Sequence, residues 1–204
     1  MKVKGEPIII MNFSGAYELE PFADHPGFIH LDCSHLNGTD CYCSHEAREQ
    51  IRQMIAPYSP EGIHFIDNGD YHYITKFWID KLNQPFSLVI FDHHSDMQPS
   101  RIPGLLSCGN WVKDAMDENR RLVKVILIGT PQDTGWNIPV NYQERVYLLD
   151  REEIRRIIAG EKPIALKGPV YISIDKDVLS TAFAETNWDQ GTLTLQELQQ
   201  TLFL

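Results

Sequence analysis

The sequence contains no apolar run that approaches the roughly 20 residues of a membrane-spanning helix, and its first residues lack the apolar core of a signal peptide. Positive charge is scarce: 18 lysines and arginines stand against 28 aspartates and glutamates, and the net charge is −10. No basic stretch occurs, so binding to the phosphates of nucleic acid is not expected. These absences argue against membrane and nucleic-acid partners. Assembly into a homo-oligomer stays open.

Cysteine is also sparse, with four among 204 residues. That number does not suggest a disulfide scaffold, so we expect the reducing environment of the cytoplasm. Cys41 and Cys43 are separated by a single residue, whereas structural zinc sites favour cysteine pairs separated by two to four residues. We therefore interpret the segment 33–45 as a loop at the border of the active site rather than as a zinc site.

Length and composition predict one globular domain over residues 1–204. A chain of 204 residues can bury a full core, and its 43% hydrophobic and 23% charged residues are typical of globular proteins. Apolar segments of strand length alternate with amphipathic segments of helix length, which predicts βαβ units and a mostly parallel sheet covered on both faces. Helices are expected after the N-cap residue Ser44, over 108–119 and 151–159, and from about Thr194 onward.

One apolar segment ends in three potential metal ligands. Residues 87–91 read Ser-Leu-Val-Ile-Phe, which is typical of a buried strand, and Asp92, His94 and Asp96 follow. Alternate residues of a strand point to the same side, and a turn after the strand can bring all three side chains to one point. Oxygen and nitrogen ligands without a thiolate suit divalent manganese, zinc or iron. A solvated charged turn has the same composition, so this segment alone leaves the metal site open.

A second segment repeats the pattern. Residues 170–174 read Val-Tyr-Ile-Ser-Ile, and Asp175 and Asp177 follow at a spacing of two. In open parallel sheets, ligands bind beyond the carboxyl ends of the strands. Two strands that each deliver acids at that end favour one shared metal site over two unrelated charged turns.

The two motifs resemble those of the ureohydrolases, the family of arginase, agmatinase and formiminoglutamase. Asp92-His93-His94-Ser95-Asp96 is similar to the family's Asp-Ala-His-x-Asp motif, and Ser173-Ile174-Asp175-Lys176-Asp177 is similar to its Ser-x-Asp-x-Asp motif. A third segment, Asn68-Gly69-Asp70-Tyr71-His72, is similar to Gly-Gly-Asp-His with one residue inserted. The motifs occur in the family's order, and the resemblance extends from about Ile63 onward.

The resemblance implies the arginase/deacetylase-like fold, a three-layer α/β/α sandwich with a mostly parallel central sheet. It also implies two divalent metal ions, with manganese favoured and zinc or iron as alternatives. Asp92 and Asp175 are expected to bridge the ions. The remaining ligands are expected to be Asp96 and His72 at one ion, and His94 and Asp177 at the other. Asp70 is the alternative to His72, which we favour because a neutral imidazole suits a site already rich in acids.

The implied activity is metal-dependent hydrolysis of a C–N bond in a guanidino, formimino or amide compound. Two ions that share a water lower its pKa toward neutrality, and the metal-bound hydroxide attacks the carbon. No catalytic role is assigned beyond the metal-bound water, and the residues that bind the substrate are not identified.

Three features depart from the pattern of the family. Ser180-Thr181 occupy the place of its usual Asp-Pro, and residues 107–111 read Ser-Cys-Gly-Asn-Trp where many members carry a proton-shuttling histidine. The sequence also ends at Leu204, within a predicted helix and before a strand that bears a substrate-binding glutamate in the family. Two alternatives stay open: a shortened variant that lacks the C-terminal strands of the family, or an incomplete sequence. Arginase activity in the strict sense is not expected.

Two other functions stay open. Histone-deacetylase-like amidohydrolases share this fold but use an Asp-x-His pair and a further Asp around one zinc, which would make Asp96, Asp177 and His72 superfluous. The other alternative is a metal-binding relative without catalysis. One bound metal ion per chain instead of two would indicate the deacetylase-like alternative. Metal binding without hydrolysis would indicate the non-catalytic relative.

Overall fold

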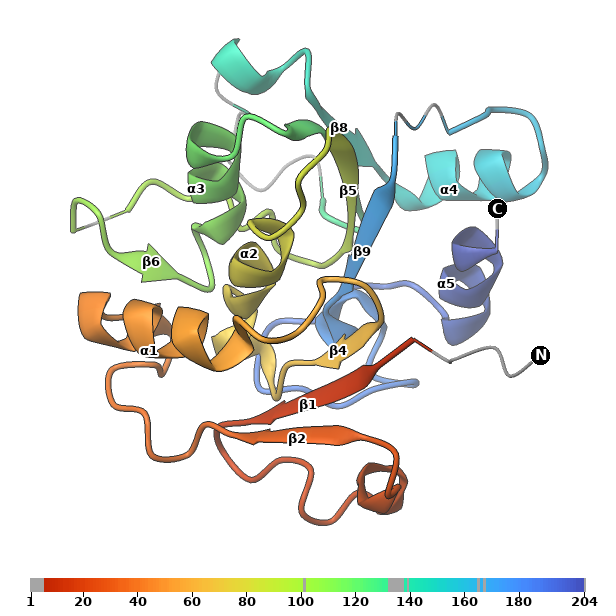
Figure 1. The fold of residues 1–204 in the computed structure, drawn as a ribbon. Helices are drawn as coiled ribbons and strands as arrows, with labels where there is room; N and C mark the ends of the chain where they lie inside the picture. Colours follow the sequence, from red (N-terminus) through yellow and green to blue (C-terminus); the bar gives the residue numbers. More distant parts are fainter. Residues whose placement is uncertain are drawn as a thin grey trace, which may run out of the picture. The chain divides into compact units, whose positions relative to one another are not determined.

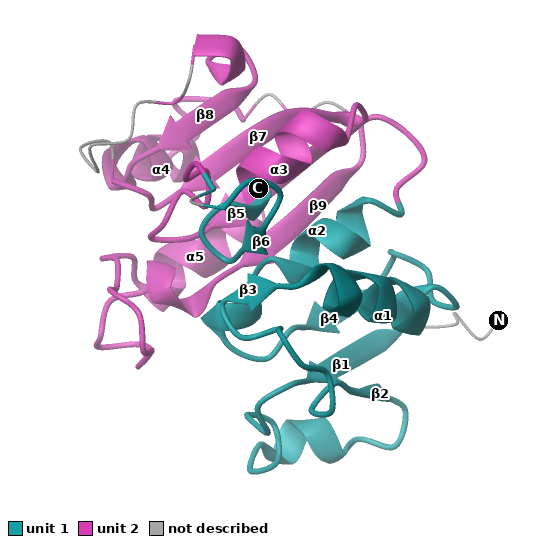
Figure 2. Cartoon of the chain, turned by 90° about the vertical axis from the view of Figure 1, so that its left-hand side faces the viewer, with its two compact units in different colours: residues 1–81, 100–111 teal, residues 82–99, 112–204 magenta. Residues whose placement is uncertain are grey.

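The computed structural model describes residues 6–100, 102–131, 138, 140–164, 166 and 168–203. The chain forms two compact units, which Figure 2 shows in different colours. Unit 1 comprises Met1–Lys81 and Ser100–Trp111, and unit 2 comprises Leu82–Pro99 and Val112–Leu204. Each unit contains a parallel sheet and helices, so the predicted α/β class is confirmed. A single domain over the whole chain stays a prediction.

Unit 1 is built on a three-stranded sheet in the order β2-β1-β4. The central strand β1 (Ile8–Asn12) pairs in parallel with β2 (Ile29–Asp32) on one side and with β4 (Ile63–Phe65) on the other (Figure 1). The three middle residues of β1 are buried, as expected for a central parallel strand that is covered on both faces. The 3₁₀ turn η1 (Pro21–Asp24) lies between β1 and β2 in the sequence.

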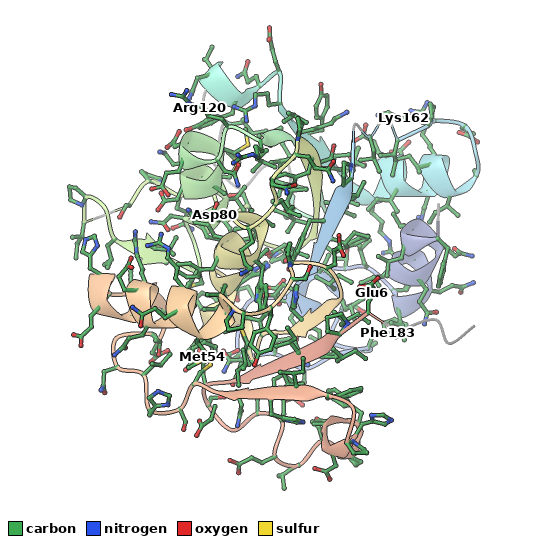
Figure 3. The ribbon with its side chains drawn as sticks, in the orientation of Figure 1. Glu6, Met54, Asp80, Arg120, Lys162 and Phe183 are labelled. Carbon is green, nitrogen blue, oxygen red and sulfur yellow. The ribbon has the colours of Figure 1, made fainter. Side chains whose placement is uncertain are left out.

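The helices of unit 1 follow local sequence signals. α1 (His45–Ile55) begins where the Ser44 side chain accepts a hydrogen bond from a backbone N–H of the first turn, at 3.1 Å, so the predicted N-cap is confirmed. α2 (Ile74–Ile79) is buried over its whole length. Asp80, labelled in Figure 3, follows α2 and pairs with the Lys76 ammonium at 2.8 Å. The buried lysine is thereby neutralised, as a buried charge requires.

The segment 33–45 is a loop over most of its length and leads into α1, as predicted, but it also contains one short strand. β3 (Tyr42–Cys43) pairs antiparallel with β6 (Leu106–Ser107), with Tyr42 opposite Ser107 and Cys43 opposite Leu106. Strands of two residues are too short to show a period-two alternation, and the partner lies far along the chain. No local pattern could therefore reveal this pair.

Unit 2 is built on a four-stranded, fully parallel sheet in the order β8-β7-β5-β9. The strands are β5 (Phe86–Phe91), β7 (Leu122–Ile128), β8 (Val146–Leu149) and β9 (Val170–Ile174). All six residues of β5 are buried, which explains why its sequence is almost continuously apolar rather than alternating. The 3₁₀ turn η3 (Val140–Tyr142) precedes β8.

Helices cover both faces of the unit 2 sheet. α3 (Trp111–Glu118) lies on one face, and α4 (Arg151–Ile158) and α5 (Leu195–Leu202) lie on the other, as Figures 1 and 2 show. On the α4 and α5 side, the two helices share one hydrophobic core with the strands, which includes Phe91, Ile128, Ile154 and Leu198. Unit 2 therefore has the three α/β/α layers that were predicted. Among the described residues, no helix is both long and apolar enough to cross a membrane.

The helix predicted over 108–119 begins only at Trp111. Before it, the Asn110 side chain accepts a hydrogen bond from the backbone N–H of Ser107 at 2.7 Å, and the Asn110 N–H donates to the Ser107 carbonyl at 3.3 Å. Short polar side chains that bond to nearby backbone favour turns over helix. Because residues 107–110 form this turn, α3 begins only after it.

Glu197 joins α5 to α4 through charged hydrogen bonds. It forms a capping box with Thr194, whose N–H donates to the Glu197 carboxylate at 3.0 Å. The same carboxylate accepts from Arg151 Nε at 3.0 Å and from Arg155 Nε at 2.9 Å. Burial by itself would raise the pKa of Glu197, but these hydrogen bonds, with that of Arg151 the largest, lower the pKa to about 2.

We predict that Glu197→Gln destabilises the protein in a pH-dependent way. The folded pKa lies below the ordinary value of 4.5, so the stabilisation is complete above pH 4.5 and is lost as the pH falls toward 2. Because the arginines are partly exposed, we expect a loss of about 1–2 kcal/mol in the free energy of unfolding at pH 7. At pH 3 the loss should shrink by more than half. Urea denaturation at both pH values measures it, with the exposed Glu152→Gln as control; a pH-independent loss would contradict the prediction.

Candidate metal centre

The register of the unit 2 sheet brings the two acidic motifs together. β5 and β9 pair in parallel with Phe91 opposite Ile174, so both strands end at the same level. The backbone N–H of Asp175 continues the ladder by donating to the Phe91 carbonyl at 2.8 Å. The residues that follow the two strands therefore occupy one edge of the sheet, as expected for ligands beyond the carboxyl ends of parallel strands.

Asp92, His94 and Asp177 form the core of the candidate centre. Nδ1 of His94 lies 2.8 Å from Oδ2 of Asp177 and 3.6 Å from Oδ1 of Asp92. Each residue contributes one ligand atom to a group in which all atoms lie within 4.8 Å of one another. Asp92 is 1% exposed and Asp177 2%, and carboxylates are buried so fully only when they are paired or bind a metal.

Asp96 also lies close to Asp92. A carboxylate oxygen of Asp96 lies within 4.8 Å of a carboxylate oxygen of Asp92. The Asp96 residue is 6% exposed. Its backbone has a φ of +51°, a left-handed conformation that non-glycine residues seldom adopt. The N–H of Val112 donates to the Asp96 carbonyl at 3.0 Å, which fixes this turn. Asp92 thus faces His94 and Asp177 as well as Asp96, as a bridging ligand would.

Asp175 caps a turn and is not among the grouped candidate ligands in the described structure. Its side chain is the N-cap of the 3₁₀ turn η4 (Lys176–Val178) and accepts a hydrogen bond from the N–H of Asp177 at 3.0 Å. Among the described residues, the groups with metal-binding geometry do not include Asp175. Its role as a bridging ligand stays a prediction, whereas its role in orienting Asp177 is visible.

Backbone contacts hold the turn after β5 in place. The N–H of His94 donates to Asp92 Oδ1 at 2.6 Å, and the N–H of His93 donates to Asp177 Oδ1 at 3.0 Å. Thr130 is fully buried, and its hydroxyl donates to the carbonyls of Asp92 at 3.0 Å and His94 at 3.2 Å. The sequence analysis did not identify Thr130, because nothing local distinguishes it from any other residue after a strand.

Gly129, at the end of β7, lets the second motif approach the sheet. A Cβ atom at this position would lie 2.4 Å from Cγ2 of Val178, and the backbone has a φ of +94°. Only glycine avoids both the steric clash with Val178 and the backbone strain of a positive φ. The absence of a side chain therefore allows η4, with Asp177, to pack against the end of β7.

The two histidines of the motif differ in their electrostatics. Hydrogen bonding to Asp177, and then to Asp92, raises the pKa of His94 to about 10, with burial acting in the opposite direction. Burial, and then the charge of His94, lowers the pKa of His93, and Asp177 and Asp189 partly offset this. In the metal-free protein, a protonated His94 therefore supplies the positive charge between two carboxylates. Oxygen and imidazole donors of this kind fit a divalent manganese, zinc or iron ion in place of that proton.

Unit 1 contains the third motif. His72 is the C-cap of the 3₁₀ turn η2 (Gly69–Tyr71), is 8% exposed, and has its ring centroid 5.0 Å from that of Trp111. Asp70 accepts a hydrogen bond from the Cys41 thiol at 3.4 Å and, with Asp40 and Cys41, forms a partly exposed group within 4.8 Å. His72 and Asp70 thus occupy separate surroundings, and the ligand role of His72 stays a prediction.

One residue beside the centre was missed by the sequence analysis. The indole of Trp188 lies 5.8 Å from the imidazole of His94, with the rings inclined at 72°. Trp188 belongs to the segment Thr186-Asn187-Trp188-Asp189-Gln190, in which a tryptophan stands among polar residues. A large aromatic in a polar loop near a strand-end motif is the signal that could have identified it.

A sequence model of the arginase family matches residues 44–202, more than half of the chain. The chain therefore belongs to the arginase family, and the resemblance to the ureohydrolases is confirmed. An uncharacterised protein of Thermotoga maritima is 34% identical over 170 residues, which cover 76% of this chain and 61% of that protein. The chain thus spans less than two thirds of the length of this relative.

Solved structures show the same fold at low sequence identity. Proclavaminate amidinohydrolase from Streptomyces clavuligerus is 15% identical and gives a TM-score of 0.67, covering 97% of this chain and 78% of that chain. A triple mutant of the T. brucei arginase-like protein, bound with Mn²⁺, is 18% identical and gives a TM-score of 0.64, covering 98% of this chain and 76% of that chain. The arginase-like fold is thereby confirmed.

We predict that Asp177→Asn lowers the pKa of His94 from about 10 toward its ordinary value of 6.5. The amide keeps the shape of the side chain but removes the negative charge that stabilises the imidazolium. An NMR titration of the imidazole C–H protons in chelator-treated protein measures the pKa. Asp189→Asn, on the neighbouring loop, is the control and should leave His94 unchanged. A His94 pKa that stays near 10 in Asp177→Asn would contradict the role assigned to this hydrogen bond.

Proposed function

We propose that this protein is a metal-dependent hydrolase of the ureohydrolase type, acting on a C–N bond of a guanidino, formimino or amide compound. The observation that carries the proposal is the buried group of Asp92, His94 and Asp177 at the carboxyl ends of two adjacent strands, in a chain of the arginase family. Buried acids and an imidazole in mutual contact are the side chains that hold divalent metals in hydrolases.

The proposed ligands are those that the motifs indicate. Asp92 is proposed as the shared ligand. Its carboxylate lies near His94 and Asp177 in one group and near Asp96 in another. Asp175 is proposed on its motif, with its observed contact to the Asp177 backbone as support. His72 is preferred to Asp70, since Asp70 is already engaged by the Cys41 thiol. The full proposed set is His72, Asp92, His94, Asp96, Asp175 and Asp177.

We propose two divalent ions, with manganese preferred. The donors are carboxylate oxygens and imidazole nitrogens, which suit manganese and give zinc or iron as alternatives. The Mn²⁺ in the arginase-like protein of T. brucei supports manganese by analogy. When bound, such a pair of ions supplies an activated water and stabilises negative charge in the transition state. Four aspartates balance the charge of two divalent ions.

The protein's own residues have defined tasks in this proposal. Asp92 and Asp177 accept backbone hydrogen bonds from His94 and His93, which fixes the carboxylate planes. Thr130 holds the carbonyls of the turn, so the imidazole of His94 cannot swing away from Asp177. Such supporting contacts orient metal ligands, and their loss typically costs 10–100-fold in metal affinity or activity.

The match to the arginase family does not favour the alternative of a single-zinc, deacetylase-like amidohydrolase. Elemental analysis of the purified protein decides between them: two ions per chain support the proposal, and one ion supports the alternative. A protein that binds two ions and hydrolyses none of the candidate compounds would instead be a metal-binding relative without catalysis.

The proposed setting is the reducing cytoplasm, with a small molecule as substrate. This proposal rests on the small number of cysteines, four among 204 residues. A homo-oligomer stays open, and analytical ultracentrifugation of the metal-loaded protein tests it.

We predict that Mn²⁺ raises the melting temperature of chelator-treated protein. An ion bound only by the folded state stabilises it by about 2.7 kcal/mol at a hundredfold excess over the dissociation constant, which corresponds to a rise on the order of 5–10 °C for a domain of this size. Mg²⁺ should raise it less, because it prefers oxygen ligands. Asp92→Ala should abolish the rise, whereas the exposed Asp24→Asn should preserve it. Melting curves that superimpose with and without Mn²⁺ would refute the metal site.

We also predict hydrolysis by the Mn²⁺-loaded protein of at least one compound in a panel of alkylguanidines, N-formimino amino acids and primary amides. Colorimetric detection of urea and enzymatic detection of ammonia report the products. Asp92→Ala and Asp177→Asn should lower the rate by about a hundredfold or more, since both hold the ions that activate water. Asp24→Asn is again the control. Equal rates in wild type and Asp92→Ala would exclude this centre as the active site.

A further inference from the structure

We propose that Trp188 is a substrate-positioning residue, whose indole face binds the planar cationic group of the substrate beside the metal centre. The inference rests on the proposed function and narrows its substrate class to organic cations such as alkylguanidinium ions. Its basis is the position, rigidity and charge of the Trp188 loop, which comprises residues 181–191.

The position of Trp188 is set by the candidate centre itself. Its ring centroid lies 5.8 Å from that of His94, and the rings are nearly perpendicular at 72°. In this geometry one ring presents an edge to the other, so the contact leaves indole surface for a third group. Trp188 retains 38% of its surface exposed although it touches a residue of the buried centre. A group that binds on this surface lies within reach of His94.

Hydrogen bonds within the Trp188 loop hold the indole in place. Nε2 of Gln190 donates to the carbonyls of Leu179 at 3.1 Å and Ala184 at 3.0 Å. The Thr186 hydroxyl donates to the carbonyl of Trp188 itself at 3.1 Å. The N–H of Gly191 donates to the carbonyl of Asp177 at 2.6 Å, which connects the loop directly to a proposed ligand. A side chain on such a loop is preorganised, so binding to it costs little conformational entropy.

The charge of the loop favours a cation. The sequence of residues 181–191 contains Glu185 and Asp189 but no lysine or arginine. Both acids are exposed. An indole flanked by carboxylates attracts cations through the ring quadrupole and through charge, and tryptophan is the best aromatic for this purpose. A neutral amide or an anionic formimino acid gains neither interaction.

The test compares two ligands of the same shape and different charge, n-butylguanidinium and n-butylurea, by calorimetric binding to Mn²⁺-loaded protein. We expect Trp188→Ala to weaken n-butylguanidinium binding about fivefold to thirtyfold and n-butylurea binding much less, so that the preference for the cation falls. Trp188→Phe should retain part of the preference. Phe183→Ala is the control, because Phe183 is 49% exposed on the same loop (Figure 3) and carries no such role.

A second readout does not depend on any substrate. Bound Co²⁺ quenches the fluorescence of nearby indoles. Trp111 lies 5.0 Å from His72, another proposed ligand, and is expected to be quenched as well. Trp188→Phe should therefore reduce the quenching by Co²⁺ without abolishing it. The melting temperature of each variant with and without Mn²⁺ shows that the fold and the metal centre persist.

The outcomes separate the two proposals. If no compound is hydrolysed but n-butylguanidinium binds in a Trp188-dependent way, the positioning role stands and the proposed function falls. If hydrolysis occurs and Trp188→Ala leaves the cation preference and KM unchanged, the proposed function stands and the positioning role is overturned. Failure of n-butylguanidinium to bind the wild-type protein, or Co²⁺ quenching as large in Trp188→Phe as in the wild type, also overturns it.

Discussion

The parallel pairing of β5 with β9 is the interaction on which the candidate site depends. It places Phe91 opposite Ile174, so that Asp92 and the η4 turn with Asp177 follow the sheet at the same level. Because side chains alternate along a strand, a shift of one residue in this register would turn one motif away from the other. The backbone ladder continues past both strands in this register, because the N–H of Asp175 donates to the Phe91 carbonyl at 2.8 Å.

The same edge concentrates charge that the fold must compensate. Asp92, Asp96 and Asp177 are buried, and a buried carboxylate is costly unless a cation or strong hydrogen bonds stabilise it. Without metal, the proton on His94 supplies the cation, and the raised pKa of that residue reflects this. The apolar core of the sheet, which includes Ile128 and Leu198, packs beside the strands that carry these residues.

The sheet edge and the Trp188 loop have different proposed roles in the site. Acids at the strand ends form a rigid ligand set, whereas the Trp188 loop provides exposed surface that can differ between relatives without disturbing the fold. Gly129 influences both the sheet edge and the Trp188 loop. Its missing side chain allows η4 to approach the sheet, and the Trp188 loop follows η4 in the chain. Under the two proposals, catalytic class and substrate class depend on different parts of the molecule.

Features governed by local physics could be predicted from the sequence. Apolar periodicity indicated the strands, Ser44 and Thr194 marked helix starts, and the spacing of acids after two strands indicated a shared metal site. Features that depend on partners distant in the sequence could not: the β3–β6 pair and the contact of Trp188 with His94. The sequence by itself determined which residues can bind metal and where strands and helices form, because those depend on neighbours within a few residues. Only the tertiary structure decided which of these side chains meet, because that depends on strand register and on the path of loops between elements.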